Sequence, residues 1–147
     1  MERIWTTELG RHIGERVRLA GWLHQLRELK QLTFLVLRDA KGLAQIVVDD
    51  PGLIEQLVSV HNESVLEVEG QVVAEPQAPG GVELHQPRVK VLVPVSYSLP
   101  FDLYRPEIKA QLPGLLDHAP VALRHPHQRA FFQLAAASMQ GFRSTLR

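Results

Sequence analysis

Phe34 and Gln45 are the two residues whose types and spacing best suit a chemical task. Two runs of strand-forming residues, 32–39 and 43–48, should pair as a hairpin around a turn at Gly42. In the register set by that turn, Phe34 and Gln45 lie diagonally on one face, about 7 to 8 Å apart. An aromatic ring beside an amide can stack a nucleobase and bind its edge, as single-stranded RNA recognition requires. The alternative is a core phenylalanine and a solvated glutamine.

Other polar side chains offer weaker signals. Arg27 and Lys30 follow the first predicted strand and can contact phosphates or form a solvated loop. Glu83, in the last predicted strand, can accept from a base amino group or simply be solvated. Three histidines, whose side chains can ligate metals, lie near the end of the chain: His118, His125 and His127. The prolines among these histidines favour no fixed ligand geometry, so we predict no metal site.

Composition limits the classes of protein that the chain can belong to. Its 147 residues are 45% hydrophobic and 22% charged, which predicts a folded domain with a real core. The 16 basic residues balance the 16 acidic ones, so a polyanion site must be a local patch. There is no cysteine, no apolar run long enough for a membrane span and no signal peptide, a pattern that fits the cytoplasm. Phosphate-binding glycine loops and nucleophile motifs are absent, so we expect no active site within these residues.

The elements that must position the hairpin form a recognisable order. Residues 16–24 and 65–74 alternate as strands, and Gly21 allows a bulge or sharp bend. A helix should begin at Pro51, and residues 82–95 should contain the last strand, with Pro87 at an edge or bulge. Three strands, a short helix and two strands are the order of a five-stranded OB-fold barrel, a mainly β fold that commonly binds oligonucleotides on strands two and three.

The residue pattern changes after the predicted barrel domain, which we assign to residues 1–95. Prolines recur through residues 96–125 with little hydrophobic periodicity, which predicts a linker or hinge. Residues 126–147 should form a C-terminal helix that begins at a proline. Its apolar residues make a single stripe: Phe131, Leu134, Ala135, Met139, Phe142 and Leu146. Such a stripe either folds back on the barrel or belongs with a domain outside this sequence.

The order of motifs around the hairpin resembles that of a known family. The series comprises Gly21-Trp22-Leu23, Arg27, Phe34, Arg38-Asp39, Gly42 and Gln45, and continues through Val68-Glu69-Gly70, Pro79-Gly80-Gly81-Val82-Glu83 and Leu123-Arg124. It is similar to the N-terminal anticodon-binding domain of class II aspartyl-tRNA synthetases. The resemblance implies that Phe34 stacks on the middle anticodon base and that Gln45 and Glu83 hydrogen-bond anticodon bases.

The resemblance also implies what these residues lack. Motifs two and three of the class II catalytic domain are missing, so ATP and magnesium would be used by a longer parent enzyme and bound by no part of this chain. Residues 126–147 resemble the first helix of a truncated catalytic domain. The parent would be a homodimer joined through that missing catalytic domain.

Two positions bear on which tRNA is chosen. Discriminating relatives of the archaeal-like type carry Trp at the position of His24 and Lys at the position of Pro79. His and Pro resemble the non-discriminating type, which charges both tRNA-Asp and tRNA-Asn and implies an Asp-tRNA amidotransferase as a partner. Two other interpretations stay open. One is a free-standing OB module that binds tRNA or single strands, and the other is the related asparaginyl or lysyl synthetase domain.

Overall fold

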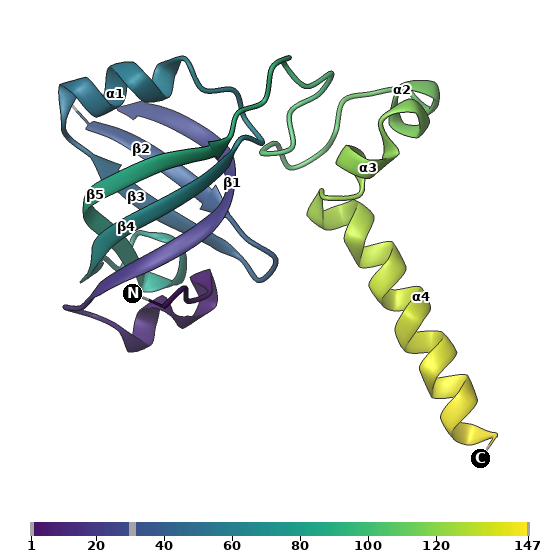
Figure 1. The fold of residues 1–147 in the computed structure, drawn as a ribbon. Helices are drawn as coiled ribbons and strands as arrows, with labels where there is room; N and C mark the ends of the chain where they lie inside the picture. Colours follow the sequence, from purple (N-terminus) through teal and green to yellow (C-terminus); the bar gives the residue numbers. More distant parts are fainter. Residues whose placement is uncertain (1, 30–31, 147) are drawn as a thin grey trace. The chain divides into compact units, whose positions relative to one another are not determined.

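The computed structural model describes residues 2–29 and 32–146 and divides into two compact units, Met1–Ser98 and Leu99–Arg147. The first unit contains the whole sheet (Figure 1). Its elements are the 3-10 helix η1 (Thr6–Arg11), the strands β1 (Arg16–Leu29), β2 (Leu32–Arg38) and β3 (Leu43–Val48), the helix α1 (Pro51–Val58), the strand β4 (Val65–Ala74), the 3-10 turn η2 (Pro79–Gly81) and the strand β5 (Val82–Val93).

The five strands form one sheet that closes in a ring, in the order β1-β2-β3-β5-β4. Every pairing is antiparallel except that between β3 and β5, which is parallel. This is the OB-fold arrangement predicted from the sequence, including the short helix between strands three and four. The predicted hairpin register is also confirmed, because Val36 pairs with Gln45 and Phe34 pairs with Val47.

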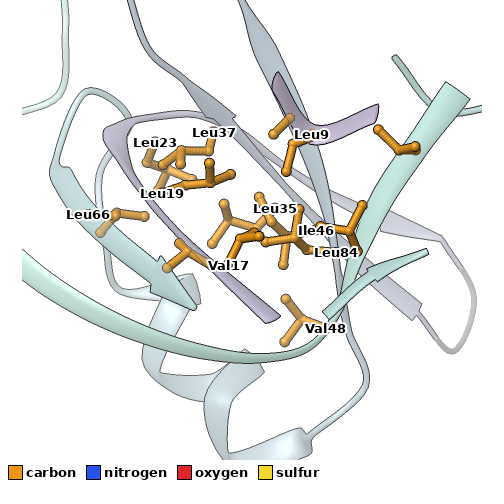
Figure 2. Packing of buried hydrophobic residues seen from close by; sticks show 14 of the residues in the cluster. Leu9, Val17, Leu19, Leu23, Leu35, Leu37, Ile46, Val48, Leu66 and Leu84 are labelled. Carbon is orange, nitrogen blue, oxygen red and sulfur yellow. The ribbon is translucent and has the colours of Figure 1, made fainter. Parts of the chain in front are cut away.

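The core lies inside the ring, and strand alternation selects its members. Leu35, Ile46 and Leu84 have no exposed surface and lie close together there (Figure 2). η1 and α1 lie at opposite ends of the ring in Figure 1, and each contributes one fully buried leucine, Leu9 and Leu57. The Asp50 carboxylate accepts a 2.7 Å bond from Leu53 N, so the predicted acidic cap starts α1 immediately before Pro51.

One predicted irregularity lies elsewhere. The pairing of β1 with β2 shifts between Leu23 and Gln25, so the bulge falls at His24. Gly21, where a bulge or sharp bend was expected, pairs in register with Leu66, so of these two alternatives the bulge is excluded. Gly21 is needed for a different reason. A Cβ there would lie 2.2 Å from the carbonyl oxygen of Arg38, so glycine lets β1 approach β2 closely. The predicted irregularity at Pro87 is confirmed, because the β4–β5 pairing shifts across Gln86 and Pro87.

The second unit contains the helices α2 (Leu112–Asp117), α3 (Ala119–Ala122) and α4 (Pro126–Thr145). Part of the stretch expected as a linker is therefore helical, namely α2 and α3. The prolines of these two helices lie in their first turns, where a missing N–H is tolerated. Phe101, Leu103 and Ala122 form a small buried cluster in this unit.

The helix α4 agrees with its predicted start and leaves its apolar stripe exposed. Phe131, Leu134 and Phe142 are each about two thirds exposed, and no described residue of α4 is buried. Among residues 2–29 and 32–146, no helix is long and apolar enough to span a membrane.

The three histidines near α4 take structural positions. His125 contacts the Arg105 carbonyl oxygen through Nε2 at 2.9 Å, and its Nδ1 accepts from the backbone N–H of His127. The ring of His118 meets Phe101 edge-on. Within the described ranges, no three groups of metal-ligating type are gathered.

Candidate nucleic-acid interface

Side chains of neighbouring strands line up in rows on the outer face of the sheet, the side away from the core. One row crosses four strands and consists of Gln25, Val36, Gln45 and Glu83. The next row crosses three strands and consists of Arg27, Phe34 and Val47. Because paired residues share a face, the four predicted binding residues that the structure describes, Arg27, Phe34, Gln45 and Glu83, lie on one surface.

Phe34 belongs to this outer face and not to the core. It is half-buried, whereas its neighbour Leu35 points into the ring and has no exposed surface. The interpretation of Phe34 as a core residue therefore does not hold. A half-buried ring on the outer face of a paired strand can serve as a stacking platform.

Gln45 and Glu83 are in direct contact. The Gln45 amide nitrogen donates to Glu83 Oε2 over 2.9 Å, across the parallel pairing of β3 with β5. The other carboxylate oxygen, Oε1, lies 2.7 Å from His85 Nε2. The Glu83 side chain is only 9% exposed, while that of His85 is 40% exposed. The outer face therefore carries a hydrogen-bonded chain of three side chains, Gln45–Glu83–His85.

Arg27 supplies positive charge beside the aromatic ring. It is exposed and pairs with Phe34 across β1 and β2, so its guanidinium can reach a phosphate next to a stacked base. Lys30, the second predicted phosphate contact, lies outside the described residues.

The two positions predicted to govern specificity lie in separate segments. His24 occupies the bulge of β1, where its Nδ1 accepts from Arg38 Nη1 over 3.0 Å. Pro79 is exposed at the start of η2, in the connection that leads into β5 and Glu83.

The Arg38-Asp39 pair has a structural explanation. Arg38 donates from Nη2 to Glu63 Oε2 over 2.7 Å, a buried ion pair that connects β2 to the segment before β4. Asp39 accepts from the backbone of Lys41 and Gly42 and from both N and Oγ1 of Thr6. The aspartate thus closes the hairpin turn and anchors η1 to it.

Two residues of this surface were missed at the level of sequence. His85 follows Glu83 by two positions, so strand alternation alone places both on one face, but its bond to Glu83 has no sequence signature. Gln25 reaches the same row only because the bulge at His24 changes which residues of β1 face outward.

Comparison with known proteins shows the family to which the chain belongs. A family model for tRNA anti-codon domains, described as an OB-fold nucleic acid binding domain, matches residues 17–92, which include both rows of the outer face. The chain belongs to this family. Within it, the outer face of β1, β2, β3 and β5 is the candidate nucleic-acid interface.

Relatives of this OB-fold domain are much longer proteins. The chain is 34% identical to an aspartate–tRNA(Asp/Asn) ligase of Archaeoglobus fulgidus, over 98% of its own length and 34% of the relative. It is 38% identical to the ligase of the same name from Thermus thermophilus, of which it covers 33%. A crystal structure of asparaginyl-tRNA synthetase from Pyrococcus horikoshii with asparaginyl-adenylate matches with a TM-score of 0.84 and 30% identity. That match covers 99% of this chain and 34% of the synthetase. The chain thus spans about a third of the length of the curated relatives it matches.

Proposed function

We propose that this chain is the anticodon-binding domain of an aspartate-tRNA ligase that charges tRNA-Asp and tRNA-Asn. The observation that carries the proposal is the outer face of the sheet, where the half-buried ring of Phe34 lies beside the hydrogen-bonded pair Gln45–Glu83. An aromatic platform beside fixed hydrogen-bonding groups matches the needs of unstacked anticodon bases. The names of the two ligases support the same function.

Each residue of the surface has its own task in this proposal. Phe34 stacks on the middle anticodon base, while Gln45 and Glu83 hydrogen-bond the base edges. Arg27, together with Lys30 by analogy of charge, contacts the phosphates of the loop. Because the chain has no net charge, this patch supplies the electrostatic attraction locally.

The choice between tRNA-Asp and tRNA-Asn rests on His24 and Pro79. The two anticodons differ in the third base, C against U, so a single missing contact relaxes the choice. We assign the chain to the non-discriminating type. The Asp-tRNA-Asn that it produces then requires an Asp-tRNA amidotransferase to become Asn-tRNA.

The rest of the proposal concerns the longer protein. Residues 1–95 form the anticodon-binding domain, residues 96–125 connect the domains, and residues 126–147 are the first helix of a class II catalytic domain that also forms a homodimer. That domain activates aspartate with ATP and magnesium in the cytoplasm. The residues of this chain carry no class II nucleotide motif, and the described ones gather no metal-ligating cluster.

The test is binding of the 147-residue chain to fluorescent stem-loop RNAs, measured by anisotropy across a salt series. Loops with anticodons GUC and GUU should bind with similar affinity and more tightly than loops with an unrelated anticodon, with affinity falling steeply as salt rises. Equal binding to every loop would contradict anticodon recognition. The second candidate is an asparaginyl-tRNA synthetase, which the structural match to the Pyrococcus enzyme favours. A strong preference for GUU over GUC would support this second candidate.

A further inference from the structure

The Gln45–Glu83–His85 chain orders the groups that face the RNA. An ionised carboxylate only accepts hydrogen bonds, so the Gln45 atom that faces Glu83 Oε2 must be the amide nitrogen. By the same reasoning, the His85 Nε2 that faces Glu83 Oε1 must carry a hydrogen. Glu83 therefore sets both the orientation of the glutamine amide and the tautomer of the neutral histidine.

The amide orientation determines which base edge the surface accepts. With its nitrogen directed at Glu83, Gln45 presents its carbonyl oxygen and its second N–H elsewhere, in one fixed arrangement. A free amide can turn over and exchange donor for acceptor, and it then accepts a wider range of base edges. Base selection by Gln45 thus depends on how firmly the Glu83 carboxylate is held.

His85 is the second group that holds this carboxylate. Its bond to Oε1 is 2.7 Å long, shorter than the 2.9 Å bond from Gln45 to Oε2. The β5 backbone at His85 is itself closely packed, since a Cβ on Gly70 would lie 3.0 Å from the His85 carbonyl oxygen. The ring is nevertheless 40% exposed, so it can be replaced without opening the core.

We propose that His85 is a positioning residue for base selection: by holding the Glu83 carboxylate, it fixes the orientation of the Gln45 amide that reads the RNA. This inference rests on the proposed function, because it requires that the outer face bind anticodon bases. In this proposal, His85 acts on base selection through Glu83 and does not itself contact the base.

The experiment measures the affinity of the whole chain for stem-loop RNAs that carry GUC or each single-base change of it. His85→Phe keeps the ring and removes the donor, whereas His85→Gln keeps a donor that can reach Oε1. In the unaltered chain, changing the base at one anticodon position should lower the affinity about tenfold, the effect of one mismatched buried hydrogen bond. His85→Phe should reduce that ratio to about threefold or less, and His85→Gln should restore it.

A matched control is available in the same unit. His12 forms a similar pair with Glu15, at 2.8 Å between Nδ1 and Oε2, outside the rows of the outer face. His12→Phe should leave every RNA ratio unchanged. Thermal melts of all variants verify that the fold persists.

A spectroscopic readout is independent of RNA. In a ¹⁵N correlation spectrum, the side-chain NH₂ pair of Gln45, assigned by its loss in Gln45→Ala, should shift in His85→Phe and return toward its original position in His85→Gln. Unchanged selectivity in His85→Phe, or equal weakening for all RNAs with the ratios preserved, would overturn the role of His85 alone. An unaltered chain that binds all anticodons equally would instead overturn the proposed function together with this inference.

Discussion

His24 is held in place by Arg38, whose Nη1 donates to His24 Nδ1 over 3.0 Å. Arginine only donates, so Nδ1 must be the acceptor, and a neutral His24 carries its proton on Nε2. The same guanidinium is fixed from its other nitrogen by Glu63. His24, which resembles a specificity determinant, is thus oriented by an arginine of β2 that is itself held in a buried ion pair.

Removing one partner of the buried Arg38–Glu63 pair should destabilise the fold strongly. The two side chains are 9% and 3% exposed, so Arg38→Ala removes the cation that is paired with a buried carboxylate. We expect a loss of about 3 to 5 kcal/mol in the free energy of unfolding, measured by urea denaturation. Arg18 and Glu67 provide the control, because the side chains of their 3.3 Å pair are 34% and 27% exposed. Arg18→Ala should cost about 1 kcal/mol or less, and equal losses in both variants would contradict this account.

Phe34→Ala should weaken RNA binding with little effect on folding. Loss of one stacked base should reduce the binding free energy by about 1 to 3 kcal/mol, measured from the affinity for the GUC stem-loop. Leu35→Ala is the matched control, because Leu35 is fully buried on the opposite face of the same strand. It should cost about 2 to 5 kcal/mol of folding stability. A Phe34→Ala chain that melts as early as Leu35→Ala would show that Phe34 is structural.

Gly21→Ala should destabilise the sheet because its new methyl group meets backbone. The added Cβ would lie 2.2 Å from the Arg38 carbonyl oxygen, so β1 and β2 must separate. We expect a loss of about 1 to 3 kcal/mol in a thermal or chemical melt. A Cβ on Gly10 would meet nothing within 4 Å, so Gly10→Ala should change stability by about 0.5 kcal/mol or less. If both variants unfold at the same temperature or denaturant concentration as the unaltered chain, the close approach at Gly21 is not rigid.

His24→Trp and Pro79→Lys should shift the choice between tRNAs. In the whole ligase, each should lower kcat/KM for tRNA-Asn more than for tRNA-Asp, by roughly ten- to a hundredfold for one lost contact or steric block. The measurement is aminoacylation of both transcripts. His24→Trp also removes the ring nitrogen that accepts from Arg38 Nη1. The folding stability of this variant must therefore be compared with that of Pro79→Lys, whose substitution lies in an exposed turn. An unaltered ligase that already prefers tRNA-Asp by several orders of magnitude would refute relaxed specificity.

Local patterns in the sequence determined much of the first unit. The turn at Gly42 was enough to predict the pairing of Val36 with Gln45, because a short hairpin leaves few registers open. The Asp50-Pro51 pair predicted the start of α1, since capping involves only neighbouring residues. The strand order and the resemblance then predicted a shared role for Phe34, Gln45 and Glu83, which the strand pairing brings to one face of the sheet.

Only the tertiary structure decided how that surface is assembled. Gln45 and Glu83 are 38 residues apart, and their contact exists because β3 and β5 pair in parallel as the ring closes. The carbonyl oxygen that Gly21 must accommodate and the guanidinium that orients His24 both belong to Arg38, on a strand that reaches them through pairing. Such contacts follow from long-range packing, which acts between strands and leaves no pattern within any one of them.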